Sequence, residues 1–181
     1  DNKSDGVKFM KKIMAFSMAV LMLALVLASC GKSDVPSGMK RVESDFIEYE
    51  FFVPTAWNVD VSNGFAAASD ASGRTVSMTQ VTPESGYESI DDYYRNHYMK
   101  TLGDTFRNVT LTESYTENFQ LGNVPACKYT LSFKIGDKEY TALQAVGAYK
   151  YHLYIFTYFA TVENFEGGLE SANKMIENIR F

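Results

Sequence analysis

Cysteine and histidine are scarce in this sequence, with two residues of each among 181. A multi-cysteine zinc site and a disulfide-stapled scaffold both need more cysteines, so both are excluded. Basic charge is also scarce, because 17 Lys and Arg residues stand against 22 Asp and Glu residues. A nucleic-acid-binding protein normally carries a basic stripe, and this chain has none. We therefore expect no nucleic-acid partner.

Apolar and aromatic residues, in contrast, are abundant. Hydrophobic residues make up 46% of the chain, with 12 Tyr and 13 Phe. This composition is too apolar for a disordered chain and is enough for a substantial core. The length fits one domain of about 150 residues with additional segments.

The first of these segments has the pattern of an export signal. Met10-Lys11-Lys12 begins a short basic stretch, and residues 13–29 are almost wholly apolar and end on small side chains. These three features together define a secretory signal peptide. The apolar stretch is short for a spanning helix, which needs about 20 apolar residues. We predict a signal peptide at 10–29 and regard residues 1–9 as an upstream mis-start or an expression remnant.

The end of this signal resembles the lipobox of bacterial lipoproteins, in the residues Leu27-Ala28-Ser29-Cys30. The resemblance implies attachment of diacylglycerol, with acyl chains such as palmitate, to the thiol of Cys30, and cleavage before Cys30. Two or more acyl chains anchor a protein stably, whereas one chain binds only marginally. We therefore expect a lipid-anchored protein of the cell membrane on its extracytoplasmic side. The alternatives are a plain signal peptide with an incidental cysteine and an uncleaved anchor.

Residues 30–44 are predicted to be a flexible tether, because Pro36-Ser37-Gly38 lies within them and no apolar period is present. Acidic residues outnumber basic ones in residues 31–181. Anionic lipids repel an acidic body, so we expect the domain at 45–181 to be held off the bilayer.

The domain pattern predicts an antiparallel sheet. Asn63-Gly64 between two short apolar segments is a hairpin signal. One apolar face is expected over 107–119, from Val109, Leu111, Tyr115 and Phe119. Residues 151–160 are apolar on both sides, which predicts a central strand covered on both faces. The expected strands are 46–53, 58–62, 65–69, 74–81, 107–119, 126–135, 139–148 and 151–160.

Two helices are expected. The first runs over 89–102, with Ser89 and Asp92 as a capping box and an end at Gly103. Its core stripe is formed by Ile90, Tyr94, Tyr98 and Leu102. The second runs over 163–178, with Thr161 as its cap, and is weakened by Gly167-Gly168. The fold class is therefore α+β.

Four motifs in order along the chain resemble those of PsbP-like domains. They are Phe51-Phe52-Val53-Pro54-Thr55-Ala56-Trp57, Gly122-Asn123-Val124-Pro125-Ala126, Tyr158-Phe159-Ala160-Thr161 with Glu163 and Phe165, and Met175-Ile176 with Ile179-Arg180-Phe181. The resemblance implies an antiparallel sheet of about six or seven strands flanked by helices, an α/β/α sandwich. Proteins with PsbP-like domains include bacterial DcrB-like lipoproteins, a photosystem II subunit and a Ran-binding import factor, which share no chemistry.

No residue pattern predicts catalysis. His97 is expected to pack on the first helix and His152 to lie at a strand edge, and no Gly-x-Ser-x-Gly motif accompanies either one. Cys127 is expected to be a small buried apolar residue without a disulfide partner. Glu88 and Asp91-Asp92 do not match a calcium loop. We predict no catalytic residue, no metal and no cofactor, and therefore no enzyme.

The sequence thus predicts a non-catalytic binding or assembly module for a protein partner in the cell envelope. The candidate contact residues are Trp57, Tyr149, Tyr151 and Tyr154, because tyrosine and tryptophan combine apolar area with a polar tip. Core packing is the alternative role for these tyrosines. The alternative function is a carrier of a small apolar ligand, with an enclosed cavity of about 300 Å³ or more between sheet and helix.

Overall fold

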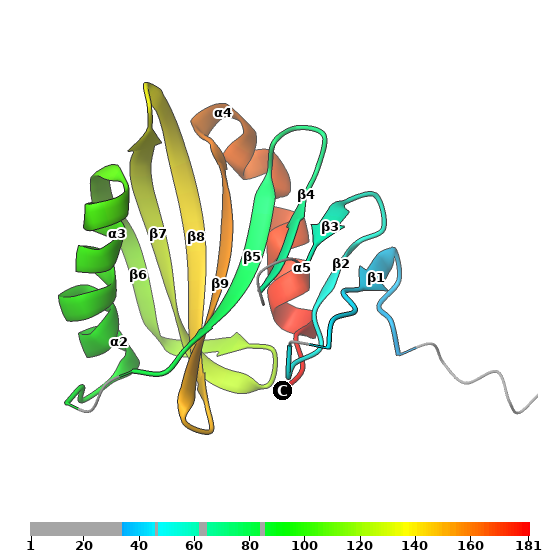
Figure 1. Cartoon of the computed structure of the whole chain (residues 1–181), viewed down its shortest axis with the longest axis horizontal. Helices are drawn as coiled ribbons and strands as arrows, with labels where there is room; N and C mark the ends of the chain where they lie inside the picture. Colours follow the sequence, from blue (N-terminus) through cyan, green and yellow to red (C-terminus); the bar gives the residue numbers. More distant parts are fainter. Residues whose placement is uncertain (1–33, 46, 62–64, 84–85) are drawn as a thin grey trace, which may run out of the picture. The chain divides into compact units, whose positions relative to one another are not determined.

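Strand β9 (His152–Thr161) lies in the middle of a seven-stranded sheet in which every neighbouring pair is antiparallel (Figure 1). The structure, a computed structural model, describes residues 34–45, 47–61, 65–83 and 86–181. The strand order is β3-β4-β5-β9-β8-β7-β6. The other strands are β3 (Asn58–Asp60), β4 (Ala66–Ser69), β5 (Thr75–Val81), β6 (Arg107–Leu121), β7 (Val124–Ile135) and β8 (Lys138–Tyr149).

The central position predicted for β9 is confirmed. Tyr154, Phe156 and Tyr158 are buried on one face of the sheet, and Leu153 and Ile155 are buried on the other. The predicted hairpin at 58–69 is present as the antiparallel pair β3 and β4. Its proposed turn, Asn63-Gly64, lies outside the described residues.

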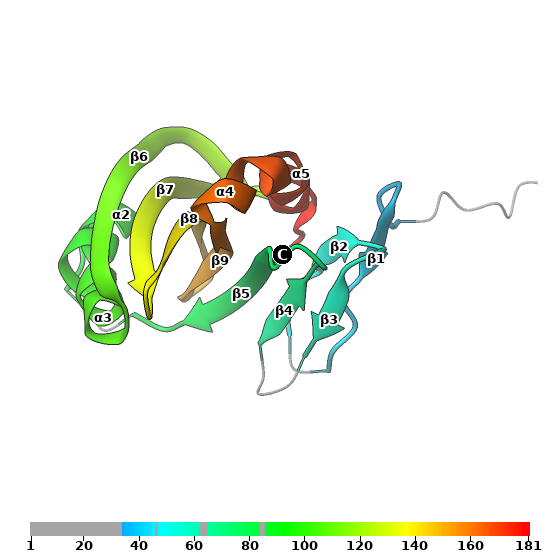
Figure 2. The ribbon, with the colours of Figure 1, turned by 90° about the horizontal axis from the view of Figure 1, so that it is seen from above.

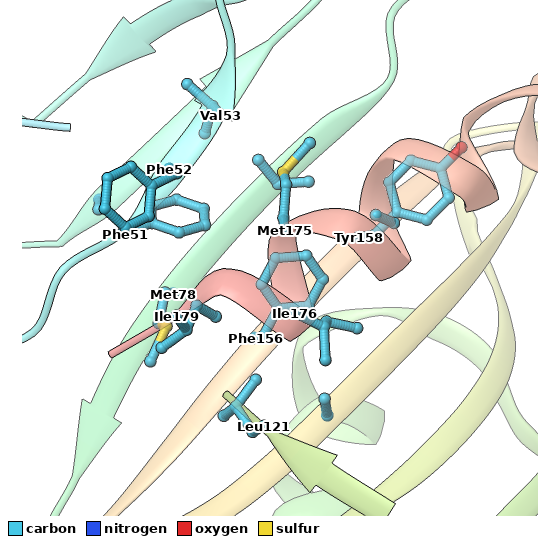
Figure 3. Close-up of a cluster of buried hydrophobic side chains, with 14 of the residues drawn as sticks. Phe51, Phe52, Val53, Met78, Leu121, Phe156, Tyr158, Met175, Ile176 and Ile179 are labelled. Atoms are coloured by element: carbon cyan, nitrogen blue, oxygen red, sulfur yellow. The ribbon is translucent and has the colours of Figure 1, made fainter. Parts of the chain in front are cut away.

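One face of the sheet is covered by the C-terminal helices. These are α4 (Val162–Phe165), the 3-10 turn η3 (Glu166–Gly168) and α5 (Leu169–Asn178). Met175 and Ile176 of α5 belong to one buried cluster with Phe156 and Met78 of the sheet (Figure 3). A two-stranded sheet of β1 (Met39–Arg41) and β2 (Phe52–Pro54) adds to this cluster, because Phe51, Phe52 and Val53 are fully buried.

The predicted second helix is confirmed in position, but two local expectations change. Thr161 lies at the cap position, yet its side chain makes no capping hydrogen bond, and Thr161 Oγ1 is buried without a partner among the described residues. The Gly167-Gly168 pair forms the 3-10 turn rather than a regular helical turn. The hydroxyl of Tyr158 occupies the space beside Gly168 and donates to the Phe165 carbonyl at 2.7 Å.

The other face is covered by one helix in three segments, α2 (Ile90–Tyr93), the π-helical η2 (Tyr94–Tyr98) and α3 (Met99–Thr105). Strands β7–β9 lie between this helix and the helices α4 and α5 (Figure 2). The Asp92 backbone N–H donates to Ser89 Oγ at 3.0 Å, which confirms the predicted cap. The predicted end at Gly103 is wrong. The helix continues to Thr105, and Phe106 then takes an extended conformation that leads into β6.

The single apolar face predicted for 107–119 is only partly present. Leu111 pairs with Leu131, but the register then shifts before Glu113. A bulge moves every later side chain to the opposite face. Tyr115 consequently pairs with Lys128 and is 51% exposed, with Lys128 Nζ 4.6 Å above its ring centre.

The folded domain begins earlier than the predicted residue 45. Val35–Phe181 form one compact unit. Met39–Arg41 pair with Phe52–Pro54, and Val42 is 3% exposed. Residues 35–44 therefore belong to the domain and not to the predicted tether at 30–44. The few apolar side chains of this segment pack into the core.

Replacing Gly168 with alanine is expected to destabilise the domain. A Cβ atom there would come closer than 3.0 Å to Tyr158 Oη and Arg74 Cδ. Overpacking of this kind costs about 1–3 kcal/mol of unfolding free energy. The matched control is Gly103→Ala in α3, where no atom lies within 4 Å of the added carbon. Gly103→Ala should stabilise by up to about 1 kcal/mol. Urea unfolding measures both, and equal effects of the two variants would contradict this packing.

Candidate functional site

A cavity of about 200 Å³ lies between the sheet and the second half of the helix that spans 90–105. Tyr98 and Leu102 line it from the helix, and Phe106 lines it from the chain that follows. The sheet contributes apolar side chains from three strands, among them Leu131, Phe133, Ala142 and Phe159. It is the pocket position that the carrier alternative predicts, but it is smaller than the expected 300 Å³.

Small side chains on adjacent strands explain why this space is open. Ser77 of β5 pairs with Thr157 of β9, and Ala142 of β8 lies on the same face. Segment α3 has no buried residue. On the opposite face of the sheet, β9 contributes Phe156 and Tyr158, which are fully buried. One cover of the sheet is therefore filled by large side chains, and the other leaves a void.

The floor of the cavity is polar. Gln144 lines the cavity and is 3% exposed, the one polar residue among those buried in the described part of the chain. Its Oε1 accepts from the Tyr94 hydroxyl at 2.6 Å, and its Nε2 donates to Thr157 Oγ1 at 2.9 Å. Burial raises the pKa of Tyr94 and of Tyr98, so both hydroxyls stay protonated at neutral pH.

The first half of the helix is held firmly against the sheet beside the cavity. The rings of Tyr94 and Tyr129 stack with centres 3.6 Å apart. The Tyr129 hydroxyl donates to Asp91 Oδ1 at 3.1 Å, and Asp91 also pairs with Arg95 at 2.8 Å. Asp91 is thereby used in positioning the helix.

The predicted contact residues fall into two groups. Trp57 is 5% exposed and Tyr154 is 2% exposed, and both lie in the core cluster under α5, so neither is accessible to a partner of the folded domain. Tyr149 is half-buried and packs against Phe181, with ring centres 5.3 Å apart. Tyr151 is 88% exposed in the turn between β8 and β9. Tyr149 and Tyr154 both pack against Phe181, but with Trp57 and Tyr154 buried the four residues do not form one exposed surface.

The two histidines and Cys127 lie apart from the cavity. His97 is exposed, with its ring centre 5.2 Å from that of Tyr93, and His152 Nδ1 lies 2.9 Å from Thr82 Oγ1. Neither forms an ion pair with a carboxylate within the described ranges. Cys127 is a buried free thiol, as predicted, and burial raises its pKa. A raised pKa disfavours the reactive thiolate.

Within the residues that the structure describes, no group of three or more His, Cys, Asp or Glu side chains is arranged to hold a metal ion. The same residues include no helix with the length and apolar character needed to span a bilayer. The predicted lipidation residue, Cys30, lies outside them.

Solved structures with this arrangement are known. The cyanobacterial PsbP protein (CyanoP) of Synechocystis sp. PCC 6803 is 18% identical and superposes with a TM-score of 0.57, over 84% of this chain and 96% of that protein. The Ran-binding protein Mog1p of Saccharomyces cerevisiae is 6% identical with a TM-score of 0.57, over 78% and 94%. Protein PA94 of Pseudomonas aeruginosa, of unknown function, is 10% identical with a TM-score of 0.52, over 78% and 95%.

These similarities establish an α+β, PsbP-like fold, as the sequence motifs predicted. No profile of a protein family and no curated protein sequence matches the chain. At such low identities the shared architecture defines the fold alone.

We expect the domain to lose stability at alkaline pH, because several of its tyrosines are buried. Burial raises the pKa of Tyr158 to about 12, from an ordinary value of about 10. The folded state keeps this proton to a higher pH than the unfolded state does, so stability should be constant below about pH 9 and fall above pH 10. Urea unfolding from pH 8 to 11 measures the decline. Tyr158→Phe should make the decline shallower, whereas identical slopes for the two proteins would refute the assignment to this residue.

Proposed function

We propose that the chain is a lipoprotein of the bacterial cell envelope, anchored at Cys30 on the extracytoplasmic side, whose folded domain acts by binding and not by catalysis. The observation that carries the proposal is the lipobox-like Leu27-Ala28-Ser29-Cys30 at the end of an export signal. The PsbP-like fold is compatible with this role, since it hosts proteins with unrelated functions and supplies no chemistry of its own.

The cavity supports binding over catalysis. An active-site cleft usually gathers titratable groups with shifted pKa values that work near neutral pH. The lining of this cavity has no acidic, basic or histidine side chain, and its two tyrosine neighbours, Tyr94 and Tyr98, are shifted away from neutrality. Such a site holds a molecule without moving its protons.

A protein partner would contact the turn between β8 and β9. Tyr151 exposes 88% of its surface there and takes no part in the core. The preceding residue, Lys150, has a φ of +54°, in the left-handed region that a lysine rarely adopts. Its Nζ lies 5.1 Å from the ring centre of Tyr149. Tyrosine is enriched among the residues that contribute most to binding at protein interfaces.

The second candidate function is the small-ligand carrier. The specific observation in its favour is the cavity under α3, with apolar walls and the Gln144 amide in its floor. Its size suits a small molecule.

Fatty-acid labelling tests the anchor. Cells that express the full chain are grown with an alkyne-bearing palmitate analogue, and the purified protein is coupled to a fluorophore. Cys30→Ser should abolish the label, because the acyl chains depend on that thiol. Cys127→Ser is the matched control and should keep it, since Cys127 is buried in the domain. A label that survives Cys30→Ser, or a wild-type chain without label, would disprove lipidation at this residue.

Photocrosslinking tests the contact surface. A crosslinking amino acid is placed at position 150 of the full chain in intact cells. It should yield one discrete protein adduct, and adding Tyr151→Ser should reduce that adduct at least about five-fold, because one interface tyrosine is commonly worth more than 1 kcal/mol. Tyr115→Ser, on the edge strand β6, is the control and should leave the adduct unchanged. No adduct, or equal loss in both variants, would rule out this surface.

A further inference from the structure

The cavity under α3 has a chemical character that defines its ligand. We infer that it binds an uncharged molecule with a single aromatic ring and one hydrogen-bonding group, of the phenol type. This deepens the carrier function proposed above and does not depend on the lipid anchor.

The size of the cavity suits a ligand with one ring. Its volume is about 200 Å³. An apolar protein cavity of about 150 Å³ is sufficient to bind benzene, whereas pockets for drug-sized molecules begin at about 300 Å³. A single ring with a small substituent fits in this space.

The walls of the cavity favour an aromatic ring. Phe106, Phe133 and Phe159 line it, with centres 4.9 Å apart for Phe106 and Phe133 and 6.2 Å apart for Phe133 and Phe159. These rings already meet one another in tilted and edge-on arrangements. A further ring among them gains both apolar burial and the same favourable ring geometry.

The polar atoms of the cavity favour one neutral hydrogen-bonding group. The Gln144 amide nitrogen has two hydrogens, and one of them is donated to Thr157 Oγ1. The Thr157 hydroxyl retains its own hydrogen for a further acceptor. A phenol oxygen beside the Gln144 amide and the Thr157 hydroxyl accepts a hydrogen bond from one of these two donors. The phenol O–H can in turn donate a hydrogen bond. A carboxylate or an ammonium group would be buried without a charged partner, because no charged side chain lines the cavity.

The cavity lies beside a π-helical segment of the helix. Tyr94, which stacks on Tyr129, is the first residue of η2, and Tyr98, which lines the cavity, is its last. A π-helical turn is rare and is enriched at functional sites. The helix stacks on the sheet at Tyr94 and lies over small side chains beside the cavity.

Ligand-observed fluorine NMR on the full chain tests the inference, with three matched probes. 4-Fluorophenol should bind saturably. Fluorobenzene has no hydroxyl and should bind about five-fold more weakly, since one hydrogen bond contributes that much. 4-Fluorobenzoate is charged and should not bind. Binding of the benzoate as tight as that of the phenol would overturn the assignment, and so would absence of saturable phenol binding.

Two variants distinguish binding of the probes in the cavity from their unspecific partition into detergent or into another part of the protein. Ala142→Leu fills the cavity and should weaken 4-fluorophenol binding at least ten-fold, while the circular dichroism spectrum stays unchanged. Thr157→Val keeps the shape of the side chain, removes its hydroxyl and should reduce the preference for phenol over fluorobenzene to about two-fold or less.

Gln144→Leu is less suitable, because it removes the hydrogen-bond partner of both Tyr94 and Thr157, whereas Thr157→Val removes one partner of the Gln144 amide. Equal phenol binding by the wild type and Ala142→Leu would overturn the cavity as the site. An unchanged preference in Thr157→Val would overturn the role of its polar floor. Either result leaves the fatty-acid label at Cys30 unaffected, so failure of this inference and failure of the lipid anchor are distinguishable.

Discussion

Burial of both faces of strand β9 is the constraint on which the rest of this structure depends. Its side chains alternate between two apolar sets, with Tyr154, Phe156 and Tyr158 on one side and Leu153 and Ile155 on the other. A strand of this kind cannot lie at an edge or face water, so each face of the sheet needs its own cover. The helices on opposite sides of the sheet meet this requirement and produce the α/β/α sandwich.

The two covers do not fit equally well, and the cavity lies on the side that is packed less tightly. The α5 side interlocks with the sheet through Met175 and Ile176 and through the Tyr158 hydroxyl, which fits only beside a glycine. The other helix is fixed at its start by stacked tyrosines but has no buried residue in α3. The space that this leaves is lined without charged groups and is the proposed binding site.

The sequence predicted those features that depend on the alternation of apolar and polar residues. It missed those that depend on how side chains from different elements pack together. Two-sided apolarity identified β9, and the Ser89 cap identified the start of the first helix. The bulge that exposes Tyr115 has no apolar signature, because shifting the register needs only one extra residue. Residue type alone also did not place Trp57, which lies in the core. The cavity was expected between sheet and helix as an alternative, but its space depends on small side chains that three separate strands bring together, which no local pattern reveals.

The contrast between a tightly packed face and an open one is tested most directly by native-state hydrogen exchange on the full chain. Amides in the centre of β9 should exchange only through global unfolding, because both of their faces are buried. Amides of Met99–Thr105 in α3 should exchange through local opening at a clearly lower free energy. Equal protection of α3 and β9 would contradict the account, since it would mean that the helix over the cavity is packed as firmly as the core.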